Sequence, residues 1–137
     1  MKKNILLFII SFIFFGCSSS DESVNSSVYN PPAWIQGTWG FKATTTGTGQ
    51  DESYFKFTSN NLCQLTFGDI ITTCWKEMTE VSPKIYSGSE NSSSDSYEIK
   101  LIAVDGIQSV TLKFKKVSAT KIIWVNSGSN IELEKLN

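Results

Sequence analysis

The chain has 137 residues, with 12 lysines, 13 acidic residues, no arginine and no histidine, and its formal net charge is −1. Arginine supplies the planar fork that grips phosphates and guanine edges, so its absence argues against a nucleic-acid partner. Histidine is the commonest general base and metal ligand, so the composition favours a protein that is not an enzyme and uses no cofactor. The length suits one domain preceded by a leader and a tether.

Residues 1–16 have the pattern of a signal peptide. Two lysines are followed by an apolar run from Ile5 to Phe15 that only Ser11 interrupts. A transmembrane helix takes about 20 apolar residues, and this run is much shorter. A basic start, a short apolar core and a small residue before the cleavage point are typical of a signal peptide. The alternative is an ordinary buried helix that happens to be N-terminal.

The motif Phe14-Phe15-Gly16-Cys17 resembles a bacterial lipobox, in which a peptidase cleaves before the cysteine and lipid is attached to its sulfur. The acidic serine run Ser18–Glu22 resembles the export signal of surface lipoproteins of the Bacteroidota. These resemblances imply that Cys17 carries several acyl chains, palmitate among them, because one chain binds membranes only marginally. They place the protein in the outer membrane, facing outward. A periplasm-facing lipoprotein is the alternative.

Residues 17–33 are expected to be a flexible tether, because they are rich in serine and carry few side chains that pack. From residue 34 to residue 137 the sequence predicts an all-β domain, in which apolar and polar residues alternate with a period of two between turns. The expected strands are residues 39–44, 53–58, 62–67, 70–76, 97–103, 110–115, 121–126 and 131 onward, with a short strand at best over 84–87. We expect residues 77–83 to be irregular, residues 88–96 to form a polar loop, and no helix of useful length.

Gly68 and Asp69 predict a two-residue hairpin turn. Cys63 and Cys74 lie equally far from this turn, so the hairpin places them opposite each other. An exported protein folds where disulfides form, and a cross-strand disulfide is therefore predicted. Two buried thiols are the alternative.

The strands are expected to form an antiparallel up-and-down meander of eight or nine strands. We expect the meander to close into a small barrel, because closure removes exposed strand edges. A flattened sandwich is the alternative. The side chains expected to point inward nearly fill such a barrel, and they are Trp39, Phe41, Phe55, Phe57, Leu65, Phe67, Ile99, Leu101, Val110, Leu112 and Phe114.

The motif Gly37-Thr38-Trp39, with Trp34 before it and Ile131–Lys135 at the end of the meander, is similar to the lipocalin-like domains of Bacteroidota lipoproteins. The resemblance covers residues 34–137. It implies that Gly37 and Trp39 close one end of the barrel. In lipocalins an arginine from a late strand often covers this tryptophan.

Two functions fit these observations. The first is a surface-anchored binding module that takes a small apolar molecule or a glycan at the open end of the barrel. The second is a structural or interaction lipoprotein with a filled core, whose outer surface contacts another envelope protein. An apolar cavity of about 300 Å³ or more would favour the first. No ligand-binding residue can be named from the sequence.

Charged residues add no catalytic or metal site. Asp51 with Glu52, and Glu77 with Glu80, show no sign of a convergent acid–base pair. Several lysines near the turn at residues 116–121 form either a solvated strand rim or a site for an anionic partner, and they are Lys113, Lys115, Lys116 and Lys121.

Replacing Cys17 by serine tests the predicted anchor. The Cys17→Ser protein should leave the membrane pellet and appear in the soluble fraction, because the sulfur that carries the lipid is gone. Fractionation of cells that express either form measures the change. A Cys17→Ser protein that still pellets with membranes would contradict the lipoprotein reading.

Overall fold

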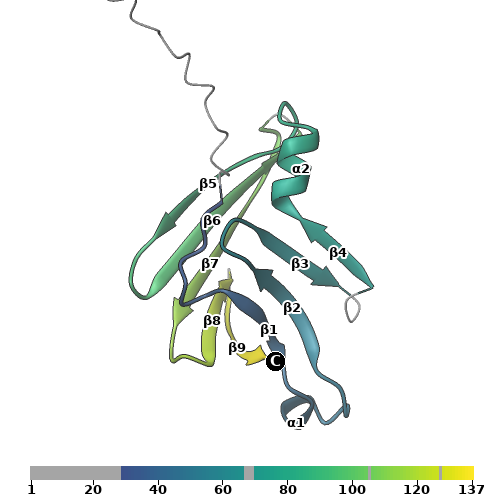
Figure 1. Cartoon of the computed structure of the whole chain (residues 1–137), viewed down its shortest axis with the longest axis vertical. Helices are drawn as coiled ribbons and strands as arrows, with labels where there is room; N and C mark the ends of the chain where they lie inside the picture. Colours follow the sequence, from purple (N-terminus) through teal and green to yellow (C-terminus); the bar gives the residue numbers. More distant parts are fainter. Residues whose placement is uncertain (1–28, 67–69, 105, 127) are drawn as a thin grey trace, which may run out of the picture.

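The computed structural model describes residues 29–66, 70–104, 106–126 and 128–137. Within these residues nine strands form one antiparallel sheet, and two short helices lie between strands (Figure 1). This confirms the predicted all-β meander. In chain order the elements are β1 (Gly37–Phe41), α1 (Ala43–Thr46), β2 (Glu52–Phe57), β3 (Leu62–Thr66), β4 (Ile71–Cys74), α2 (Trp75–Val81), β5 (Ser87–Ser92), β6 (Ser96–Ala103), β7 (Gln108–Lys116), β8 (Lys121–Asn126) and β9 (Ser129–Leu136).

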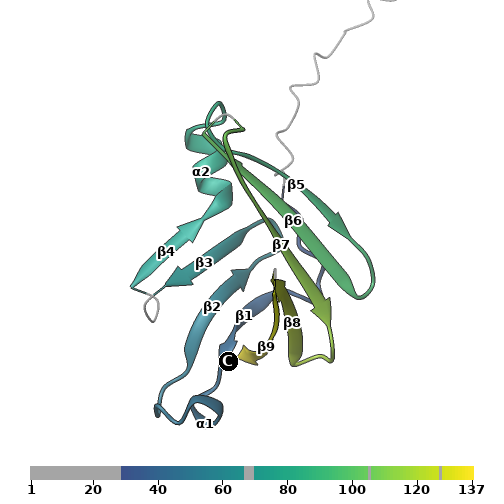
Figure 2. The same cartoon turned by 180° about the vertical axis from the view of Figure 1, so that it is seen from behind.

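The sheet is curled but open. Its strand order is β4-β3-β2-β1-β9-β8-β7-β6-β5, so the first and last strands pair, while β4 and β5 are the two edges. The expected closed barrel is therefore wrong, and the sheet forms a half-barrel that is open between β4 and β5 (Figures 1 and 2). The chain leaves β4 into α2 instead of turning directly back into a strand, which separates the two edges.

Aromatic contacts across the interior show how strongly the sheet curls. The ring centroid of Phe57 on β2 lies 6.0 Å from that of Tyr97 on β6 and 5.1 Å from that of Phe114 on β7. Three strands separate β2 from β7 in the sheet. At about 4.8 Å per strand, a flat sheet would hold β2 and β7 about 19 Å apart. The inner faces therefore meet, and their side chains fill the space between them.

Most of the inward-facing side chains are those that the alternation predicts. Trp39, Phe55 and Phe57 are buried on β1 and β2, as expected. Phe41 is only partly buried, and Val110 is 44% exposed. Phe67 lies outside the described residues. The buried cluster also contains residues outside the expected set, namely Tyr29, Ile35, Leu62, Tyr97, Ile122 and Leu133.

In strand β3 the face that points into the half-barrel is the opposite of the one expected. Leu62 pairs with Phe57, and Gln64 pairs with Phe55, so Leu62 and Gln64 share the inner face with these buried rings. Leu65 was expected to point inward and instead belongs to the other face, where it is only partly buried. Because side chains alternate along a strand, a shift of one residue exchanges the two faces.

Helix α2 occupies residues that were expected to be strand and irregular chain. Its backbone is held at the start by Asn61, whose Oδ1 accepts the Lys76 N–H at 3.0 Å. The Asn61 amide also donates to the Glu77 carboxylate at 2.7 Å. A carboxylate in the first turn interacts favourably with the positive end of a helix. A side chain distant in sequence thus stabilises the helix, which local alternation does not reveal.

Strand β5 replaces the expected polar loop. Its inner face consists of small or polar residues, because Gly88 pairs with Leu101 and Glu90 pairs with Ile99. Apolar alternation is therefore missing, although the backbone pairs with β6 along its whole length. Backbone pairing with a neighbour, rather than its own side chains, makes this segment a strand.

Strand β1 ends at Phe41, earlier than expected, and a β-bulge lies beside it. Trp39 pairs with Phe55 and Gly40 pairs with Ser53, so Tyr54 is the extra residue. A Cβ at Gly40 would collide with the carbonyl oxygen of Glu52. Gly40 therefore permits the close approach of backbones that the bulge requires.

Tyr29 covers the polar inner face of β5. Its side chain is completely buried, and its hydroxyl lies 2.9 Å from Thr79 Oγ1 on α2. A Cβ at Gly88 would come within 2.8 Å of the Tyr29 hydroxyl, so the glycine makes room for the ring. Tyr29 belongs to the segment 17–33 that was expected to be a tether, and its side chain packs into the domain.

Replacing Tyr29 tests this boundary. Tyr29→Ala should lower the free energy of unfolding by about 3–5 kcal/mol, which is usual for truncating a buried aromatic ring. Tyr29→Phe should cost about 1 kcal/mol, because it keeps the buried ring and removes the hydrogen bond with Thr79. Urea denaturation of the full chain in detergent measures both. If neither substitution changed the free energy of unfolding, Tyr29 would not contribute to the folded domain.

Candidate functional site

A pocket of about 630 Å³ lies on the inner side of the half-barrel, between β2, β3 and β8. The loop after α1 borders it. The pocket is lined by Thr48, Gln50, Asp51, Glu52, Ser53, Tyr54, Phe55, Gln64, Leu65, Thr66 and Trp124. None of these residues was predicted to bind a ligand, so the pocket is evident only from the structure.

Phe55 and Trp124 form the aromatic part of the lining. Their ring centroids are 4.9 Å apart in an edge-to-face arrangement. The Phe55 ring also contacts Phe114 at 5.1 Å, so the aromatic lining continues into the buried core. Trp124 is only partly buried, and its indole N–H donates to no side chain or carbonyl among the described residues. One polar group at this surface is therefore free to bind a ligand.

Gln64 supplies an oriented amide to the lining. It faces inward on β3 because it pairs with buried Phe55. Its Oε1 accepts the Trp75 indole N–H at 3.3 Å. The Gln64 amide nitrogen has no partner among the described residues and remains a donor. The sequence did not reveal this residue because Leu65, its neighbour, was expected to face inward.

Carboxylates give the pocket its charge. Asp51 accepts the Ala43 backbone N–H at 2.9 Å, which joins the end of the loop after α1 to the first residue of that helix. Glu52 is the next residue of the lining. No lysine belongs to the described lining, so the pocket carries negative charge without a matching positive charge.

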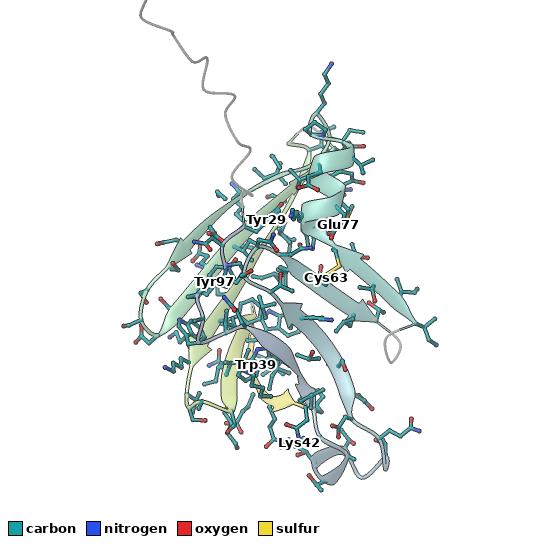
Figure 3. The ribbon with its side chains drawn as sticks, viewed as in Figure 1. Tyr29, Trp39, Lys42, Cys63, Glu77 and Tyr97 are labelled. Atoms are coloured by element: carbon teal, nitrogen blue, oxygen red, sulfur yellow. A yellow bond between two sulfur atoms is a disulfide. The ribbon has the colours of Figure 1, made fainter. Side chains whose placement is uncertain are left out.

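Gly37 and Trp39 were expected to close one end of a barrel. Trp39 lies where β1 pairs with β9 (Figure 3), and Gly37 pairs with Phe57 on β2. Trp39 is completely buried, and its indole N–H donates to the Ile35 carbonyl at 2.6 Å. Lys135 Nζ of β9 lies 5.5 Å from the ring centroid, within reach of a cation–π interaction. Gly37 has a φ of 127°, which side chains rarely adopt. Gly37 therefore allows a backbone conformation that other residues rarely adopt.

Cys63 and Cys74 form the predicted disulfide, with sulfur atoms 2.01 Å apart (Figure 3). They pair directly in the β3–β4 ladder, as the hairpin prediction requires. The turn residues 68 and 69 lie outside the described residues. Cys63 pairs with Lys56 across β2, so the disulfide lies on the outer side of the sheet, away from the face that carries Phe55. It joins the edge strand β4 to the rest of the sheet.

A second polar cluster surrounds Glu90 on β5. Its carboxylate accepts the Tyr97 hydroxyl at 2.8 Å and the Asn30 backbone N–H at 2.9 and 2.8 Å. Burial raises the pKa of Tyr97 well above its ordinary value, and the hydrogen bond to Glu90 raises it further. Burial also raises the pKa of Tyr29, the hydrogen bond with Thr79 lowers it, and the charge of Glu90 raises it. These hydrogen bonds hold Tyr29 and Asn30 against the sheet and α2.

Three lysines of the described residues form ion pairs at the surface. Lys113 lies 2.9 Å from Glu98, and Lys121 lies 2.6 Å from Glu132. Glu80 lies 3.7 Å from Lys76 on the same helix. In the described ranges no three side chains of the metal-binding types come together. Of the two α2 carboxylates, Glu80 pairs with Lys76 and Glu77 accepts the Asn61 amide.

Cys17 and the expected signal peptide lie outside the described residues. In the part of the chain that is described, no helix is long and apolar enough to cross a membrane. Comparison with family models, curated proteins and solved structures gave no match to the chain.

Proposed function

We propose that this chain is an outer-membrane lipoprotein, anchored through acylated Cys17 and facing outward, whose half-barrel domain binds a small molecule. The pocket between β2, β3 and β8 carries this proposal. Its volume of about 630 Å³ falls within the usual range for ligand sites, roughly 300–1,000 Å³. Its lining combines aromatic rings with a larger number of polar and charged side chains.

The geometry around Trp39 supports a lipocalin-like origin of the domain. The first and last strands pair there, and a cation from the last strand lies over the tryptophan ring. Lysine takes the position where the resemblance implies an arginine. In this proposal Gly37 and Trp39 close the side of the half-barrel where β1 meets β9.

The arrangement of the elements suits a pocket that faces away from the membrane. The described chain begins at Tyr29, beside α2 and β5, while the loop after α1 borders the pocket at the opposite end (Figures 1 and 3). An anchor that precedes Tyr29 would hold the α2 end toward the lipid. The pocket would then be open to molecules outside the cell.

A second function, contact with another envelope protein, has its own observation. Apolar side chains are exposed where α2 ends and the β6–β7 hairpin turns: Val81 and Ile107 are 82% and 80% exposed, and Ile85 and Val104 are 45% exposed. Ser87 pairs with Ile102, so the chain before β5 approaches this hairpin turn. Exposed apolar clusters of this kind mark interaction surfaces.

Native mass spectrometry of the protein extracted from its own membranes tests the binding function. We expect a bound small molecule in addition to the lipid on Cys17. Thr66→Trp should displace it, because Thr66 is an exposed residue of the pocket lining and an indole there would occupy the space. Thr111→Trp is the matched control, since Thr111 is an exposed strand residue outside the lining.

A bound molecule that is lost in Thr66→Trp and kept in Thr111→Trp would support the pocket. No bound molecule in either the parent or the control protein would favour the interaction role. A molecule retained by all three proteins would place the ligand elsewhere.

A further inference from the structure

The aromatic part of the pocket lining suits a flat, partly apolar surface. Phe55 is nearly buried, and Trp124 and Tyr54 are partly buried beside it. Tyr54 is the bulged residue of β2, and its ring packs edge-to-face on Phe41 at 5.3 Å. A sugar ring offers such a surface, because its axial C–H groups form an apolar face that packs on aromatic rings.

The polar lining offers both donors and acceptors. The Trp124 indole N–H and the Gln64 amide nitrogen are donors without partners among the described residues. Asp51 and Glu52 provide acceptors, and Gln50 can do both. A hydroxyl group donates one hydrogen bond and accepts two, so a molecule rich in hydroxyls can satisfy this mixture. A purely apolar ligand would cover these groups and leave them unpaired, at a cost for each.

The charge of the lining excludes a further class of ligand. Two carboxylates and no described lysine surround the space. A fatty acid, a phosphate ester or an acidic sugar would bring a negative charge next to them. Like charges at short range repel, the more strongly where water is partly excluded. The ligand is therefore neutral or positive.

We infer that the pocket between β2, β3 and β8 binds a neutral, hydroxyl-rich sugar, with one ring face on Trp124 and its hydroxyls on Gln64 and the two carboxylates. This inference rests on the proposed binding function and narrows the ligand from a small apolar molecule or glycan to a neutral glycan. Carboxylates that accept hydroxyl groups form charge-assisted hydrogen bonds, which are the stronger kind.

Isothermal titration calorimetry with the full chain, in a detergent that has no sugar head group, provides the test. The probes are neutral trisaccharides of glucose, galactose, mannose and N-acetylglucosamine, with palmitate and spermidine as an anionic and a cationic comparison. We expect at least one trisaccharide to bind, and palmitate and spermidine to bind more weakly or not at all.

Trp124→Phe locates the binding. It keeps an aromatic ring against Phe55 but removes the indole N–H and part of the stacking surface, so sugar affinity should fall about tenfold or more. Trp34→Phe is the matched control. Its indole N–H donates to the Ser93 carbonyl at 3.2 Å, outside the pocket, and sugar affinity should stay within about twofold.

The outcomes separate this inference from the proposed function. Sugar binding that Trp124→Phe weakens and Trp34→Phe does not would support both. Palmitate or spermidine that binds in a Trp124-dependent way, with no sugar binding, would overturn the sugar and keep a binding module. Sugar binding that is equal in both variants would overturn the site. If no probe bound, the inference of a sugar ligand would be wrong. The mass-spectrometry experiment would then show whether the domain binds any small molecule.

Discussion

Contacts between aromatic rings across the interior hold the sheet in its curled shape, and the other features depend on them. On β2, the Phe57 ring contacts Tyr97 on β6 and Phe114 on β7 across the interior. The Phe55 ring contacts Phe114 and Trp124. Rings of this size bury much apolar surface and add edge-to-face attraction. The interior is solid around Phe57. Next to Phe55 and Trp124 the lining turns polar, and the pocket begins there.

The open side of the half-barrel is stabilised by a different means. A closed barrel would satisfy the edges of β4 and β5 by pairing them, whereas here α2 and Tyr29 lie near the gap. Glu90 on β5 would face the interior unpaired, but the Tyr97 hydroxyl and the Asn30 backbone N–H bind its carboxylate. The N-terminal segment thus belongs to the fold. It also fixes the end of the domain at which the chain from Cys17 arrives.

Alternation predicted the strands that carry an apolar inner face, such as β2, β6 and β8, and turn spacing predicted the disulfide pair. Alternation did not predict the elements whose inner face is polar, or those that a side chain distant in sequence stabilises. β5 shows no apolar period because Gly88 and Glu90 face inward, and α2 depends on Asn61. The pocket was not predicted because its walls come from β2 and β8, which the curl brings together. Its polar wall also depends on which face of β3 carries Gln64, and one residue of register decides that.

Amide hydrogen exchange of the full chain, followed residue by residue by NMR, tests the open half-barrel most directly. Amides that bond β1 to β9 should exchange slowly, because opening them requires unfolding of the joined sheet. The outward amides of β4 and β5, which lie at the two edges, should exchange at least about 100-fold faster. Slow exchange of those edge amides, equal to that of β1 and β9, would mean that β4 and β5 pair and that the barrel is closed.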